Sequence, residues 1–190
     1  MALSYSHFKG AHVTRAELVE RVVVERILAS GEQIPDKQRV WGKVFELKHS
    51  SGVIQIGRLL AEKRGLNSEL AGLACVLHDI YVNDTGQGKD HAQLGSVIAA
   101  KILRDTGKFT DEEIALITQA VKNHSDKHII STNPYDELVK DADVLECSLY
   151  ENIKAGYLEE KPVETCRIYF ERIKKVRREM GLPDKGQWEI

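Results

Sequence analysis

Apolar residues recur along this chain at intervals of three and four positions, the spacing that places them on one face of an α-helix. The first such segment is expected to begin at a capping box formed by Thr14 and Glu17 and to end at Gly31. A longer helix is expected from about Asp36 to Gly65. Its apolar stripe includes one histidine and consists of Phe45, His49, Val53, Ile56 and Leu60.

Capping residues and prolines mark the helices that follow. A third helix is expected to begin at Asn67 or Ser68 and to finish at the His78–Asp79 doublet, with residues 81–86 forming its end. Others are expected to begin near residues 90, 110 and 134, and a last one runs from Pro162 to about Met180. No segment shows the sustained alternation of a strand. The sequence therefore predicts an all-α fold, a compact bundle of roughly seven helices.

Composition and charge narrow the class of protein. Of 190 residues, 42% are hydrophobic and 29% are charged, as in an ordinary globular domain, and the formal charge of −2 offers no basic footprint for a nucleic-acid polymer. The chain has no apolar run long enough to span a membrane and no signal-peptide pattern. Its three cysteines are scattered, which favours free thiols in a reducing compartment. We expect a cytoplasmic protein.

Four histidines, one on each of four predicted helices, occupy apolar faces: His49, His78, His91 and His124. A single histidine in such a place is more often a hydrogen-bonded core residue than a ligand. Four of them, one followed directly by Asp79, would each need a separate buried partner, whereas a shared metal ion would satisfy them all. The pattern therefore favours a metal centre inside the bundle, with separate hydrogen-bonded core histidines as the alternative.

A further carboxylate ligand is expected from the segment Lys140–Glu146, which contains Asp141 and Asp143. Residues two apart lie on different sides of a helix. The apolar stripe of this segment lies somewhat nearer Asp141 than Asp143, so periodicity leans weakly to Asp141 and leaves the choice open.

The order of these motifs resembles the HD-domain superfamily of metal-dependent phosphohydrolases over about residues 45–150. His49 is followed after twenty-nine residues by His78–Asp79, and later by Ala142–Asp143–Val144–Leu145. The resemblance implies that His49, His78, Asp79 and Asp143 bind one divalent metal, so that Asp143 is preferred to Asp141. The whole chain, residues 1–190, is expected to form one domain, with a C-terminal helical extension at about 162–180.

The resemblance also implies a second ion. Subgroups of the superfamily with two metals add two histidines, which His91 and His124 resemble, and Asp79 would then bridge the ions and activate water. Many members carry a lysine shortly after the doublet, where this chain has Tyr81, Val82 and Asn83. Imidazole and carboxylate ligands suit Mn, Fe, Zn, Ni or Co better than Mg or Ca. We therefore expect one or two divalent transition-metal ions.

The expected activity is hydrolysis, by metal-activated water, of a phosphate ester or anhydride of a nucleotide or a similar small phosphorylated metabolite. Residues near the ligands in sequence are candidates to supply positive charge for the substrate, with a solvated surface position as the alternative for each: Lys89, Lys122, Lys127, Arg58 and His128. Two other functions remain open, a di-iron oxygenase of the HD type and a non-catalytic ligand-binding or structural metal module. The last helix, rich in Arg and Lys interspersed with Glu, is typical of a solvated face, with a homo-oligomer contact or a contact with an anionic surface as the alternative.

Overall fold

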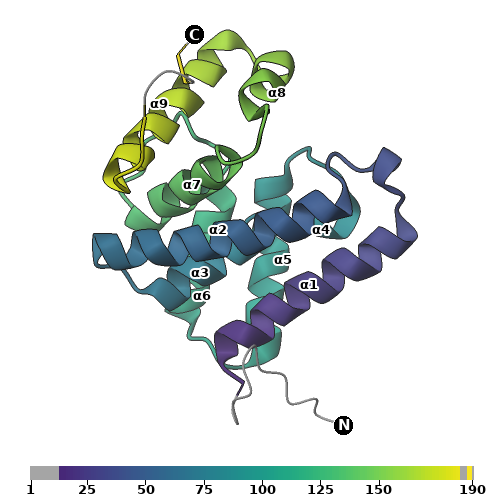
Figure 1. Ribbon diagram of the computed structural model, residues 1–190. Coiled ribbons are helices and arrows are strands. Elements are labelled where there is room, and N and C mark those ends of the chain that lie inside the picture. Colours follow the sequence, from purple (N-terminus) through teal and green to yellow (C-terminus); the bar gives the residue numbers. More distant parts are fainter. Residues whose placement is uncertain (1–12, 185–187, 190) are drawn as a thin grey trace.

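The computed structural model describes residues 13–184 and 188–189, and every α-helix and 3-10 helix in these ranges belongs to one all-helical bundle (Figure 1). These ranges contain no strand. The all-α prediction is therefore confirmed. The helices are α1 (Arg15–Gln33), a 3-10 turn η1 (Asp36–Gln38), α2 (Lys43–Arg64), α3 (Ser68–Leu77), α4 (Ile80–Thr85), α5 (His91–Thr106), α6 (Asp111–Asn123), α7 (Pro134–Cys147), α8 (Ile153–Glu160) and α9 (Val163–Glu179).

Two of these helices, α4 and α8, were not predicted. They have six and eight residues, too short to show a helical period in the sequence. The segment expected to be a mere helix end at 81–86 is α4 itself. Among the described residues the bundle thus has nine α-helices where roughly seven were expected.

The predicted capping boxes are present, but two helix boundaries were wrong. Thr14 and Glu17 cap each other at the start of α1, as predicted. The helix passes through Gly31, where a Cβ would lie 2.7 Å from a side-chain carbon of Lys43, so this glycine permits close packing and does not end the helix. The second long helix begins at Lys43 and not near Asp36. The 3-10 turn at Asp36–Gln38 is followed by Arg39, whose backbone is extended and whose side chain is buried.

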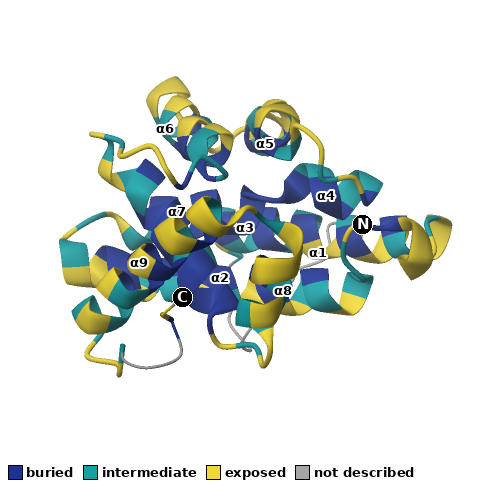
Figure 2. Ribbon diagram, turned by 90° about the horizontal axis from the view of Figure 1, so that it is seen from above, coloured by how far each residue is buried: buried dark blue, intermediate teal, exposed yellow. Residues whose placement is uncertain are grey.

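The core surrounds α3, whose residues Leu70–Leu77 are all buried (Figure 2). Gly57 on α2 lies directly against the thiol of Cys75 on α3, and this lack of a side chain lets the two helices approach closely. A second cluster joins α7, α8 and α9 around Tyr157, Cys166 and Phe170. The helical extension therefore packs on the same end of α7 that carries Asp143. The three cysteines are free and buried, and no described helix is both long and apolar enough to cross a membrane.

Candidate metal centre

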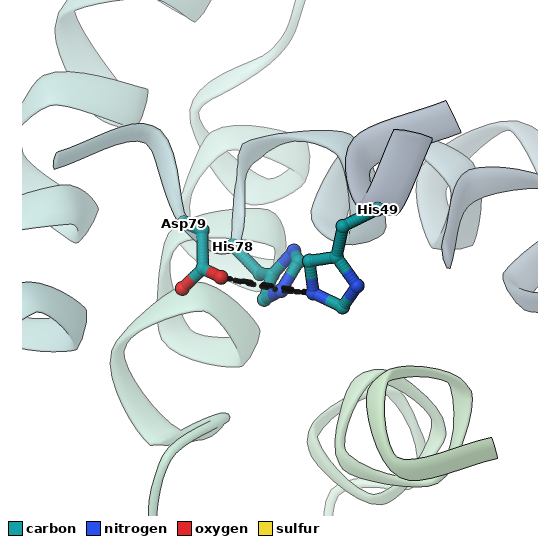
Figure 3. Close-up of side chains that lie close together, drawn as sticks. All are labelled: His49, His78 and Asp79. Carbon is teal, nitrogen blue, oxygen red and sulfur yellow. Dashed lines mark hydrogen bonds and ion pairs between the residues drawn. The ribbon is translucent and has the colours of Figure 1, made fainter. Parts of the chain in front are cut away.

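Five separate parts of the chain bring imidazoles and carboxylates to one buried point. His49 lies in α2, His91 is the first residue of α5, and His124 follows the end of α6. The doublet His78–Asp79 occupies the break between α3 and α4, where Asp79 leaves helical geometry with φ −104° and ψ 20°. This break allows two adjacent side chains to point the same way, and Figure 3 shows both directed toward His49.

Asp79 lies between two pairs of histidines. Its Oδ2 atom is 3.1 Å from Nε2 of His78 and 3.7 Å from Nε2 of His49. Its Oδ1 atom is 3.3 Å from Nε2 of His124 and 3.4 Å from Nε2 of His91. Within each pair the Nε2 atoms are close together, 3.2 Å for His49 and His78 and 3.1 Å for His91 and His124. The Asp79 carboxylate thus lies against both pairs of histidines, one pair at each oxygen.

The outer nitrogen of each ring determines what the inner nitrogen can do. Each Nδ1 lies at hydrogen-bond distance from an acceptor: Cys75 O for His78 (2.6 Å), Gly88 O for His91 (2.8 Å), Val121 O for His124 (2.7 Å) and Glu146 Oε2 for His49 (2.6 Å). A carbonyl oxygen only accepts, so Nδ1 must donate the proton, and in a neutral ring Nε2 is then a lone pair. When all four rings are neutral, four Nε2 lone pairs face inward.

Four such lone pairs and the Asp79 carboxylate need a positive charge among them, which a proton on His78 or a bound cation supplies. Burial opposes a charge on His78, yet the Asp79 carboxylate outweighs burial and raises the pKa of His78 to about 9. Burial lowers the pKa of His124 to about 4, which keeps that ring neutral. Burial would raise the pKa of Asp79, but His78 and His124 hold it well below its usual range. An ionised Asp79 with a buried Oδ1 that has no hydrogen-bond partner among the described residues fits a divalent cation.

Asp143, and not Asp141, lies at this cluster. Its Oδ1 atom is 3.5 Å from Nε2 of His49, and its Oδ2 atom is 2.6 Å from Nζ of Lys127. Asp141 is directed elsewhere, to ion pairs with Arg64 (2.6 Å) and Arg172 (2.7 Å). The weak periodicity argument for Asp141 is not supported by this placement, because α7 is buried around most of its circumference and has no single inner face.

A cavity of about 270 Å³ opens onto the cluster. Aromatic rings form much of its wall: Trp41, Phe45, Tyr157 and Tyr169. Residues of α8 and Lys161 after it also line the cavity. Because α8 was not predicted, the part of the cavity wall that it forms was not predicted either.

The proposed substrate-binding residues lie in different places. Of the described residues that line the cavity, the only one in that predicted group is Lys127. Lys89 and Lys122 are exposed, His128 lines a separate groove along α9, and Arg58 pairs with Glu20 on α1 at 2.6 Å. A part for these other four in substrate binding remains a prediction that their positions do not favour.

An all-helical bundle with a buried centre of histidines and aspartates is suited to bind divalent metal ions. The family model for the HD domain matches residues 47–147, which include all six predicted ligands and more than half of the chain, so the chain belongs to the HD domain family. Members of this family bind divalent metals, and the cluster described above is suited to hold one or more. Searches of curated proteins and of solved structures find no significant match to the chain.

Proposed function

We propose that this protein is a phosphohydrolase that uses divalent transition metal to cleave a phosphate ester or anhydride of a small phosphorylated metabolite, with nucleotides among the candidates. The observation that carries the proposal is the Asp79 carboxylate, each oxygen of which faces two inward Nε2 atoms. Bound divalent ions would lower the pKa of water and offset charge on phosphoryl oxygens. The ligand set suits Mn, Fe, Zn, Ni or Co.

The protein's own residues supply positioning. His49, His78, Asp79 and Asp143 would hold one ion, and His91, His124 and the same Asp79 a second. The outer hydrogen bonds keep each imidazole in the tautomer that presents Nε2, so no rearrangement is needed on binding. Lys127 offsets the charge of Asp143 beside the cavity.

The cavity supports a small substrate. Its volume of about 270 Å³ is just below the range of about 300–1,000 Å³ that is usual for sites that enclose a small molecule. The lining of the cavity is mostly apolar, and a low-dielectric wall strengthens electrostatic interactions within the site. A polymer would have to place a single unit in this space, and the formal charge of −2 gives no field to attract a polyanion.

The proposal is tested with protein purified without chelator. We expect elemental analysis to find a transition metal, with about two equivalents if all six ligands serve, and a screen of phosphorylated metabolites to find one from which phosphate is released. Folded wild-type protein that carries no metal and releases no phosphate would contradict the proposal. Turnover that stops when oxygen is removed would instead identify an oxygenase.

Replacement of Asp79 by Ala separates catalysis from structure. The proposal predicts a folded protein with little turnover, because the bridging carboxylate is lost while the apolar core around α3 remains. If Asp79→Ala unfolds, and the wild-type protein also unfolds when its metal is removed, the metal is structural.

A further inference from the structure

Lys127 carries a buried ammonium at the inner end of the cavity. It lies in the turn that follows α6, three residues after His124, and its side chain is only 5% exposed. Its Nζ atom donates to Asp143 Oδ2 at 2.6 Å and to the carbonyl oxygen of His124 at 2.9 Å. An ammonium has three N–H donors. Two acceptors are thus accounted for among the described residues, and the side chain lines the cavity.

The turn that holds Lys127 is itself fixed. Arg172 on α9 donates to the backbone carbonyl of Lys127 at 3.1 Å, and Asp141 on α7 holds Arg172 at 2.7 Å. The ring of Tyr169 lies 5.6 Å from Nζ on the cavity side. The ammonium is therefore held in place before any ligand arrives, as a site for a charged group requires.

Positive charge is scarce in this cavity. Of the described residues that line it, Lys127 and Lys161 are the two that carry an ammonium or guanidinium. Lys161 is half-buried at the mouth, where it lies over the rings of Tyr157 and Tyr169. Lys127 alone of the two adjoins a carboxylate of the metal cluster.

We propose that Lys127 contacts the substrate, donating its third N–H to an anionic oxygen of the group that binds beside Asp143. The inference rests on the proposed phosphohydrolase function and adds to it a specific residue outside the six predicted ligands. A charged donor in a water-excluded site binds an anion strongly. The site would therefore require an anionic oxygen at this position and discriminate against neutral analogues of the same size.

Lys140 offers a matched control. It is also a buried lysine, 1% exposed, and its ammonium also donates to one carboxylate, Glu137 at 3.1 Å, and to one carbonyl, Ile129 at 2.8 Å. It differs in that it does not line the cavity. Lys140→Met therefore removes a buried ion pair of the same chemistry without changing a residue that lines the cavity.

The experiment measures binding of inorganic phosphate by calorimetry to metal-loaded wild-type protein, Lys127→Met and Lys140→Met, with metal content determined for each. Loss of one hydrogen bond between charged groups predicts phosphate binding weaker by about ten- to a hundredfold in Lys127→Met. We expect its metal content to equal that of the wild type and Lys140→Met to bind phosphate normally. If Lys127→Met does not fold, Lys127→Gln keeps an N–H for Asp143 while removing the charge, and the same loss is expected.

Phosphate binding that is unchanged in a folded neutral variant would overturn the proposal. Loss of metal in proportion to loss of phosphate binding would also overturn it, because Lys127 would then act only through Asp143. These outcomes are distinct from failure of the proposed function, which would show as a wild-type protein that binds no phosphate or releases none from any ester.

Discussion

Glu146 is predicted to control the metal affinity of one half of the centre. Its Oε2 atom lies 2.6 Å from Nδ1 of His49, and both side chains are buried. A carboxylate behind a metal-binding imidazole fixes the ring orientation and raises its basicity. The other three histidines have backbone carbonyls in this position. Glu146→Gln keeps the size of the side chain and removes the negative charge.

The size of the effect follows from two independent considerations. Loss of a partner behind a ligand weakens metal binding by about ten- to a hundredfold, which corresponds to about 1.4–2.8 kcal/mol. A hydrogen bond to a charged group contributes about 1.5–3 kcal/mol. Because Glu146 contacts His49 and not His91 or His124, the loss should fall on one ion. We therefore expect a titration in which the binding step of the ion held by His49 moves and the other step does not.

The assay is competition with a chromogenic chelator, monitored for wild-type protein and Glu146→Gln. Asp136→Asn is the control, because Asp136 is another buried carboxylate on α7 and its Oδ2 atom accepts from Asn123 at 2.7 Å, away from the cluster. If Glu146→Gln kept a metal affinity within twofold of wild type, Glu146 would not control metal binding through His49. An equal loss of affinity in the control would contradict this role as well.

Three further changes test other contacts. In Gly52→Ala the new Cβ would lie 2.6 Å from Glu146 Oε1, so we expect weaker metal binding, measured as above, and an overpacking cost of about 1–3 kcal/mol in urea unfolding. Arg39→Met leaves Glu46 buried without its partner; burial already raises the pKa of Glu46, and we expect a loss of about 3–5 kcal/mol by the same method. Burial of Glu137 is outweighed by a backbone N–H and an arginine, which lower its pKa below the ordinary 4.5. The ionised Glu137 therefore stabilises the fold fully above pH 4.5, and this stabilisation is lost as pH falls through the lower folded pKa. The Tm difference between wild type and Glu137→Gln should shrink on acidification. A constant difference would contradict this assignment.

Helical periodicity was sufficient to find the histidines. His49 and His124 follow the apolar stripes of α2 and α6, which pack one side against α3, and His78 ends α3, which is buried on all sides. A polar residue in such an apolar pattern is visible in the sequence. Periodicity could not choose between Asp141 and Asp143, because α7 packs on several sides at once. The order of the motifs, which reflects a whole fold, favoured the aspartate that lies at the cluster.

The cavity could not be predicted in the same way. Its wall depends on α8, which is too short to show a period, and its inner cation depends on the turn after α6. In that turn the backbone directs Lys127 inward and leaves His128 exposed, although the two are adjacent in sequence. Arg58 is near the ligand His49 in sequence, but its position on α2 directs it to Glu20. Sequence proximity is a poor guide where tertiary contacts determine side-chain direction.

The most direct test of the metal centre is anomalous diffraction from crystals of the protein grown with Mn²⁺. We predict anomalous peaks on both sides of the Asp79 carboxylate, one within about 2–2.5 Å of the Nε2 atoms of His49 and His78 and the other at the same distance from those of His91 and His124. A single peak between His49, His78 and Asp143 would retain the centre with one ion. Well-ordered density for all of these side chains, with no anomalous peak among them, would show that the cluster does not bind Mn²⁺ and would contradict a metal centre.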